Sequence, residues 1–149
     1  MLSIFRDPYV RRYLWDSLIV ELADVDSIIA ASSAAFLQYG LGIWCASERA
    51  RPTVTIGFVG ARPNDAGELE LIYGFLPEHW GRGFALEAAS EVLSLAFARG
   101  QPRVWAGTDL ENKASQRVMQ RLGMRFDRSE KVGGLPQVFY VIERAAQRG

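Results

Sequence analysis

The sequence has little cysteine or histidine and no excess of charge of either sign. A single cysteine, Cys45, excludes a disulfide within the chain, and a single histidine, His79, argues against a histidine-rich metal site. The 149 residues include 17 Lys and Arg and 17 Asp and Glu, so the formal net charge at pH 7 is zero. The scarcity of cysteine and histidine leads us to expect no bound metal. The balanced charge leads us to expect no nucleic-acid partner, because it gives no net positive field to attract a phosphate backbone.

Long apolar runs are also missing. Without a run of about 18 apolar residues, the sequence predicts no transmembrane helix. Arg6, Arg11 and Arg12 stand among polar residues near the start, which lacks the apolar core of a signal peptide. The chain has 49% hydrophobic and 23% charged residues, as an ordinary globular protein does. We expect residues 1–149 to form one domain in a reducing cytoplasm, with no membrane partner.

Hydrophobic periodicity predicts alternating helices and strands. Asp7 and Pro8 are typical of a helix start, and Gly40 and Gly100 of helix ends. The predicted helices are Pro8–Trp15, Glu21–Gln38, Phe84–Arg99 and Asn112–Leu122. The predicted strands are Gly42–Glu48, Thr53–Val59, Glu68–Leu76, Arg103–Thr108, Met124–Ser129 and Gln137–Glu143, with turns at 62–67 and 133–136.

The order of these elements predicts an α/β fold around one mixed sheet. Three sequential strands with short connections favour an antiparallel meander. The strand, helix and strand between 68 and 108 form a right-handed crossover, so strands 68–76 and 103–108 should be parallel. The last two strands should form a C-terminal hairpin, and the helices should flank the sheet.

The most informative segment is the glycine turn Trp80-Gly81-Arg82-Gly83-Phe84-Ala85, between a predicted strand and a predicted helix. The free N–H groups and the dipole of a helix N-terminus favour an anion, and glycine lets a ligand approach the backbone. Glycine can also serve turn geometry alone. No Gly-Lys-Ser/Thr follows, so a P-loop is excluded, and the preceding meander argues against a dinucleotide fold. A pyrophosphate without catalytic Mg²⁺ fits better.

Three blocks resemble the GNAT acyltransferases, specifically their RimJ/RimL-like branch. The run from Glu70 to Ala88 is similar to the family's E-L-x-Y…P-x-x-W-G-x-G-x-A-x-E-A. Asn112–Ser115 is similar to its N-x-x-S, and Arg121–Met124 to its K-L-G-F. Element order agrees over roughly Gly42 to Val141, so the resemblance implies a GNAT-like fold with a splayed parallel strand pair.

The resemblance implies acetyl-CoA, or a close acyl-CoA, as the co-substrate. The backbone from Gly81 to Ala85 would hold its pyrophosphate, and the pantetheine arm would pair with exposed main chain where the third strand splays. The N–H near Phe75 would polarise the thioester carbonyl. The residues implied in binding are Phe75, Leu76, Trp80, Gly81, Arg82, Gly83, Phe84, Ala85, Asn112 and Ser115.

The implied reaction is direct attack of an amine on the thioester, which needs a base for the amine and an acid for the thiolate. Glu70 matches the family's strand glutamate and is the candidate base; otherwise it is a solvent-facing carboxylate. Ser115 could hydrogen-bond the thiol sulfur or simply bond its own helix. The tyrosine acid of many GNAT enzymes is replaced by Met119, so Ser115 or water would serve, or the thiolate would leave unassisted.

Two other side chains have competing interpretations. His79 stands beside the glycine turn and could touch a phosphate, but a lone exposed histidine is more often incidental. Cys45, within a predicted strand, is expected to be a small core residue.

The chain departs from the family at its start. Branch members begin with a strand before the first helix, whereas Met1–Arg6 leads almost directly into a helix, so that edge strand is missing or replaced. An exposed sheet edge invites pairing, which suggests a homodimer. The leading function is an acetyl-CoA-dependent N-acetyltransferase. The alternatives are a non-catalytic acyl-CoA-binding or regulatory module and an interaction protein whose glycine turn is structural. The amine acceptor is left open: protein N-terminus, amino acid, polyamine or antibiotic amine.

Overall fold

The computed structural model describes residues 2–8 and 22–145. The predicted helix Pro8–Trp15 lies almost wholly outside these residues. The helices are α1 (Leu2–Arg6), α3 (Leu22–Tyr39), α4 (Phe84–Ala98) and α5 (Lys113–Arg121), with a 3₁₀ turn η1 (Pro77–His79). The strands are β1 (Ile43–Glu48), β2 (Arg51–Pro63), β3 (Leu69–Phe75), β4 (Arg103–Asp109), β5 (Arg125–Val132) and β6 (Leu135–Glu143).

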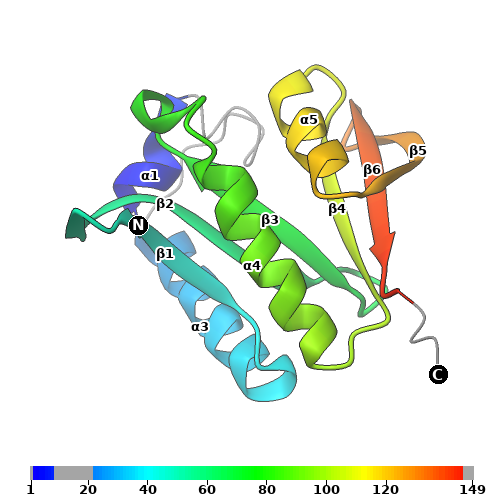
Figure 1. Ribbon diagram of the computed structural model, residues 1–149, viewed down its shortest axis with the longest axis horizontal. Coiled ribbons are helices and arrows are strands. Elements are labelled where there is room, and N and C mark those ends of the chain that lie inside the picture. The colour runs from blue at the N-terminus through cyan, green and yellow to red at the C-terminus, as the bar shows by residue number, and fades with distance from the viewer. Residues whose placement is uncertain (1, 9–21, 146–149) are drawn as a thin grey trace.

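These strands form one six-stranded mixed sheet in the order β1-β2-β3-β4-β6-β5 (Figure 1). β1, β2 and β3 form the predicted antiparallel meander, and β5 and β6 the predicted hairpin. β3 and β4 are parallel, joined by the crossover helix α4. The predicted fold class and the parallel pair are therefore confirmed.

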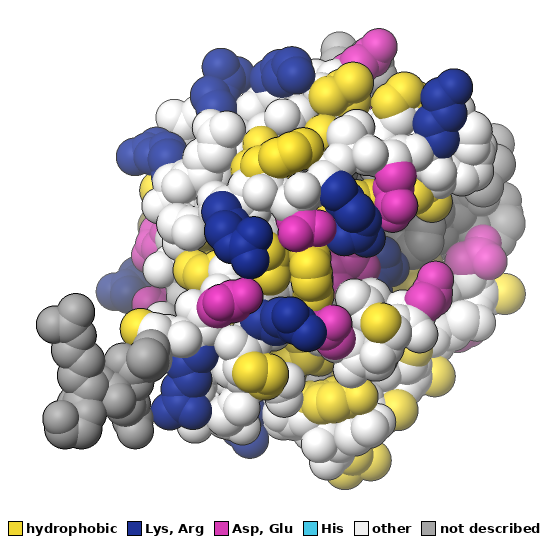
Figure 2. Space-filling view, turned by 90° about the vertical axis from the view of Figure 1, so that its right-hand side faces the viewer, with side chains coloured by type: hydrophobic (Ala, Val, Ile, Leu, Met, Phe, Trp, Pro, Cys, Tyr) yellow, Lys and Arg dark blue, Asp and Glu magenta, His cyan; other side chains and the backbone are white. Residues whose placement is uncertain are grey.

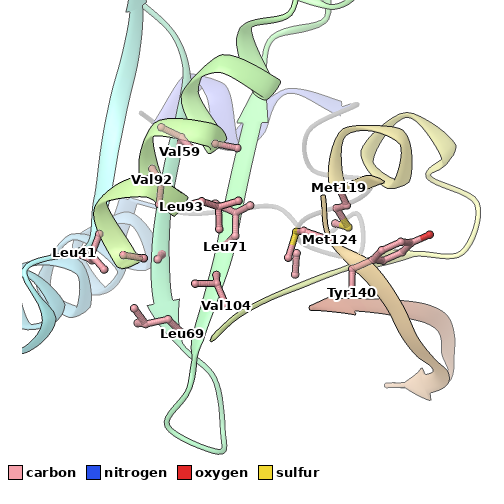
Figure 3. Close-up of a cluster of buried hydrophobic side chains, with 14 of the residues drawn as sticks. Leu41, Val59, Leu69, Leu71, Val92, Leu93, Val104, Met119, Met124 and Tyr140 are labelled. Atoms are coloured by element: carbon pink, nitrogen blue, oxygen red, sulfur yellow. The ribbon is translucent and has the colours of Figure 1, made fainter. Parts of the chain in front are cut away.

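Helices cover both faces of the β1–β3 part of the sheet. On one face, α4 packs its buried residues Ala89, Val92, Leu93 and Ala96 against Leu71 and other strand residues (Figures 1 and 3). On the opposite face, α1 and α3 pack against β2 and β3 in a second cluster of buried residues, which comprises Ile4, Phe5, Val25, Phe58 and Ile72. Because successive side chains of a strand alternate between faces, Leu71 and Ile72 belong to different cores.

The connection between β2 and β3 is shorter than predicted. β2 continues to Pro63, because residues up to Pro63 still pair with β3, in a register that ends at Leu69. The turn is therefore confined to Asn64–Gly67. The Asn64 side-chain oxygen accepts hydrogen bonds from the N–H groups of Ala66 and Glu68, both at 3.0 Å, in the manner of an Asx turn.

The C-terminal hairpin is tighter than predicted. Gly133 and Gly134 both have positive φ, at 58° and 83°, which is the requirement of a two-residue type I′ turn. β5 and β6 consequently pair up to Val132 and Leu135 on either side of it.

The parallel strands β3 and β4 separate almost at once. Their pairing is a single bridge, between Glu70 and Trp105, whereas β4 pairs with β6 along its whole length. The sheet therefore opens beyond Glu70, as the predicted splay requires. In the described part of the chain, no helix is both long and apolar enough to cross a membrane.

Candidate functional site

A groove of about 780 Å³ runs through the opening between β3 and β4. Its walls come from β3, the glycine turn with the start of α4, the start of β6, and α5. Nine of the eleven predicted site residues line it: Glu70, Phe75, Trp80, Gly81, Gly83, Phe84, Ala85, Asn112 and Ser115. Leu76 and Arg82 are not among its lining residues.

The glycine turn leaves the start of α4 free for a ligand. Gly83 is the N-cap with φ 81° and makes no side-chain capping bond, so the orphan N–H groups of the first turn lack that partner. Gly81 also has a positive φ, 71°. A Cβ at either glycine would meet no atom within 4 Å. Glycine is needed here for its left-handed backbone, and the space beside it is open.

The Arg82 side chain pairs with the end of β1 and is not part of the groove lining. Its Nη1 lies 3.2 Å from Oε1 of Glu48, at the end of β1. The same oxygen lies 3.1 Å from Arg51 Nη2 and 3.2 Å from Nδ1 of the buried His79. Partial desolvation raises the pKa of Glu48, but hydrogen bonds from Arg51 and Arg82 outweigh it and the pKa is lowered. Glu48, which the sequence analysis missed, thus connects the glycine turn to β1.

Trp80 joins the glycine turn to β3. Its indole N–H donates to the carbonyl oxygen of Phe75 at 2.7 Å, while half of the residue stays exposed. The contact fixes the turn relative to the last residue of β3. Trp80 therefore forms part of the groove wall next to the point where the strands separate.

The main chain of β3 faces this opening at every second residue. In an antiparallel ladder, residues that bond to the partner strand alternate with residues whose N–H and C=O point the other way. The Leu76 N–H donates to the Ile56 carbonyl of β2 at 3.0 Å. By alternation, the main-chain groups of Phe75 and Tyr73 point toward β4, across the splay.

Glu70 lies on the other side of the same opening. Its Oε2 is 3.5 Å from Nε of Arg62, the residue opposite it in β2, and its side chain is 20% exposed. A Cβ at Gly107 would come within 3.5 Å of Glu70 Oε1 and 2.9 Å of the Phe139 ring. The absence of a side chain at Gly107 thus leaves room for the carboxylate across the splay.

Ser115 is held by two contacts. The Asn112 side chain caps α5 by accepting from the Ser115 N–H at 3.1 Å. The Tyr73 hydroxyl donates to the Ser115 carbonyl at 3.2 Å and lies 2.8 Å from Ser115 Oγ, where either oxygen can donate. Burial raises the pKa of Tyr73 to about 12, against a smaller lowering by Ser115. Met119 is buried at 2% exposure.

Tyr73 is the functional candidate that sequence reasoning missed. It stands in the E-L-x-Y block quoted above, but the sequence analysis gave it no role. Its phenol spans from β3 to α5 and so reaches Ser115, a contact 42 residues apart in sequence. Among the described residues, no group of three or more His, Cys, Asp or Glu side chains could hold a metal ion.

A family model described as an acetyltransferase (GNAT) domain matches residues 1–125. The chain belongs to the GNAT acetyltransferase family. This GNAT chain is 35% identical over 127 residues to the uncharacterized N-acetyltransferase YoaA of Bacillus subtilis, covering 80% of this chain and 69% of YoaA. It is 32% identical over 106 residues to YkkB of the same organism, an uncharacterized protein, covering 68% of this chain and 61% of YkkB.

Solved structures of the family share the fold. An acetyltransferase of Agrobacterium tumefaciens superimposes with a TM-score of 0.81 at 20% identity, over 96% of this chain and 82% of that one. A phosphinothricin acetyltransferase of Sinorhizobium meliloti, solved in complex with acetyl-CoA, superimposes with a TM-score of 0.79 at 18% identity. That match covers 95% of this chain and 80% of that one. At such identities the likeness concerns the fold.

Proposed function

We propose that this GNAT chain moves an acetyl group from acetyl-CoA to a primary amine by direct attack. The observation that carries the proposal is the groove itself. It joins an uncapped helix N-terminus, a strand whose main chain faces the opening, and a carboxylate within one continuous wall. The N-terminus of α4 suits the pyrophosphate of acetyl-CoA, and the exposed main chain of β3 suits its pantetheine amides. The Glu70 carboxylate, a proton acceptor, lies at the far end, where the thioester would be.

The main-chain groups of this chain would bind and orient acetyl-CoA. The N–H groups from Gly81 to Ala85 would hold the pyrophosphate, and Tyr73 and Phe75 would pair with the pantetheine amides. The Tyr73 N–H, which lies nearer to Glu70 along β3 than that of Phe75, would donate to the thioester carbonyl, whose oxygen gains negative charge in the transition state. The thioester supplies an activated carbonyl and a leaving thiolate.

The two sides of the splay would have different tasks: Glu70 accepts a proton on one side, and Ser115 donates a hydrogen bond on the other. Glu70 would take the proton of the attacking amine, directly or through one water, while the C–N bond forms and the C–S bond breaks. The Ser115 hydroxyl would donate to the leaving sulfur. For this, the single Tyr73 proton would turn from the Ser115 carbonyl to Ser115 Oγ, which leaves the serine proton free for the sulfur. The thiolate takes its proton from water after release.

The first experiment measures acetyl-CoA binding by calorimetry and thiol release with a panel of amines. We expect Glu70→Gln to bind acetyl-CoA with unchanged affinity and to lose about 100-fold in kcat, as general-base removal does. Glu68→Gln is the matched control, because Glu68 pairs with Arg103 and Trp105 and does not line the groove. Equal turnover of Glu70→Gln and the unaltered chain would contradict the role of Glu70.

Met119 supports a second candidate, a non-catalytic acyl-CoA-binding or regulatory module. Its buried thioether cannot donate a proton to a thiolate. Acetyl-CoA binding without thiol release for any amine in the panel would favour this module. Placement in the RimJ/RimL-like branch stays a proposal that rests on the three sequence blocks.

A further inference from the structure

The groove has a second mouth on the face of the sheet opposite α4. Glu70 and Ile72 alternate along β3 with Leu71, which packs in the α4 core, so both side chains lie on the α1–α3 face. Arg62 pairs with Glu70 across β2 and β3 and lines the groove at the same place. Among the described residues, Arg62 and Glu70 lie together at this mouth.

A smaller cavity adjoins this mouth. It has a volume of about 190 Å³ and lies between α3 and the sheet, and it shares Arg62 and Ile72 with the groove. The other described residues around it are Phe5, Ile28, Ala31, Ser32, Ala35, Ile43, Phe58, Ala61 and Pro63. The volume far exceeds the ~10–15 Å³ that one water needs, and the lining is mostly apolar. The cavity suits a branched or aromatic hydrocarbon side chain.

Where the groove and the cavity meet, a positively charged and a negatively charged side chain form a pair. Arg62 Nε lies 3.5 Å from Glu70 Oε2, and the arginine side chain is 49% exposed. A free α-amino acid carries an amine and a carboxylate on one carbon, next to its side chain. Its three groups match the carboxylate of Glu70, the guanidinium of Arg62 and the apolar cavity.

We propose, building on the proposed acetyl transfer, that the acceptor is a free α-amino acid with an apolar side chain. The carboxylate binds Arg62, the amine approaches Glu70, and the side chain enters the cavity. The amine loses its proton to Glu70 as its nitrogen bonds to the acetyl carbon, and the sulfur leaves with the C–S electron pair. A peptide N-terminus would leave Arg62 without its carboxylate, and a polyamine would leave the cavity without an apolar occupant.

The surface toward β5 and β6 gives no reason to expect a highly charged acceptor. Figure 2 shows basic and acidic side chains interspersed on that side of the molecule. Several form ion pairs, among them Arg125 with Glu143 and Arg128 with Asp127. Neighbouring opposite charges cancel at a distance, so they provide little steering for a polycation.

The test compares kcat/KM for leucine, leucinamide, 3-methylbutylamine, alanine and a leucyl dipeptide at saturating acetyl-CoA. We expect leucine to exceed its amide, its decarboxylated amine and the dipeptide by about tenfold or more, since a charge-assisted bond is lost in each. Alanine should fall by a similar factor, since it leaves the cavity unfilled.

Two variants assign these preferences to the two contacts. Arg62→Met should remove the preference for leucine over leucinamide and weaken leucine binding in calorimetry, with acetyl-CoA affinity unchanged. Ala31→Phe, at an exposed position of the cavity wall, should remove the preference for leucine over alanine. Ala34→Phe is its control, because Ala34 is also exposed on α3 but does not line the cavity.

The outcomes separate the two proposals. Equal or faster acetylation of the amide, the amine or the dipeptide overturns the amino-acid acceptor and leaves acetyl transfer standing. Preferences that persist in Arg62→Met and Ala31→Phe also overturn it. Acetyl-CoA binding with no acetylation of any amine contradicts the proposed function itself, and the acceptor proposal falls with it.

Discussion

At the scale of single residues, the splay places groups with opposite proton tasks on its two sides. Glu70 can accept a proton on the α1–α3 face, and the Ser115–Tyr73 hydroxyl pair can donate on the α5 side. A phenol with a pKa of about 12 stays protonated throughout the neutral range. It is too weak an acid to protonate a thiolate of pKa near ~8.5 outright, so its role is to donate a hydrogen bond through Ser115.

Tyr73→Phe should lower kcat about five- to tenfold and leave acetyl-CoA affinity nearly unchanged. The reason is that it removes one neutral hydrogen bond, from the Tyr73 hydroxyl to Ser115, which in turn bonds the departing sulfur. Ser115→Ala should have a similar effect. The double variant should be little worse than either single one, because both residues act through one contact. Steady-state kinetics and calorimetry measure the three effects, and strictly additive losses would contradict a shared path.

A pH series gives this prediction a readout independent of catalysis. Burial raises the Tyr73 pKa from 10.0 to about 12, so the folded chain retains the proton where the unfolded chain loses it. The corresponding stability is complete below pH 10 and is lost as the pH rises toward 12. In urea unfolding, the free energy of unfolding should fall less steeply over this range in Tyr73→Phe than in the unaltered chain.

At single residues, the sequence predicted features that depend on neighbouring positions. It did not predict side-chain contacts between elements that are distant in sequence. A helix was predicted from Asn112, and the structure has Asn112 as the N-cap of α5. Cys45 was expected in the core and is exposed, since it lies on an edge strand. His79 is buried against Glu48, 31 positions earlier, rather than exposed. Such distant partners have no signal in local periodicity.

At the scale of elements, the glycine turn makes a prediction with an internal control. Gly83 and Gly67 both have positive φ, 81° and 76°, and both have open space where a Cβ would stand. Alanine at either site should cost about 1 kcal/mol of stability through backbone strain. Only Gly83→Ala should weaken acetyl-CoA binding, by about tenfold, because it alone alters the turn before α4.

Denaturant unfolding and calorimetry of Gly83→Ala and Gly67→Ala measure stability and affinity separately. If Gly67→Ala weakens acetyl-CoA binding as much as Gly83→Ala, the effect is general destabilisation and the glycine turn is not the pyrophosphate site.

Element order and strand pairing were predictable because hydrophobic alternation, helix caps and crossover handedness act locally, whereas the splay was implied only by the family resemblance. The exact ends of the strands were less predictable. β2 continues to Pro63, the last residue of the strand, where a proline without a backbone N–H is tolerated. The cavity beneath α3 could not be predicted, because it arises where Ala31 and Ala35 meet Arg62 and Phe58 of a distant strand.

At the scale of the whole molecule, the sheet ends at β1 on one side. Among the described residues, β1 pairs only with β2. The Ala61 N–H donates to the Gly42 carbonyl, so by alternation the main-chain groups of Ile43 and Cys45 point outward. Ser32 Oγ accepts the Ile43 N–H at 2.7 Å, and register shifts after Ala46 end regular pairing.

We propose that two copies pair along β1 through the outward main-chain groups of Cys45, because the Ile43 N–H is already bonded to Ser32 and an outward-facing strand edge is a template for another chain. Light scattering at micromolar concentration should then give twice the 16.6 kDa mass. Antiparallel pairing brings the two copies of the exposed Cys45 close together, so a short bismaleimide should join them, and Cys45→Ser should not be joined. A monomeric mass without cross-linking would contradict the dimer. A dimeric mass without cross-linking would place the contact elsewhere, because antiparallel pairing along β1 would bring these two thiols within reach of the reagent.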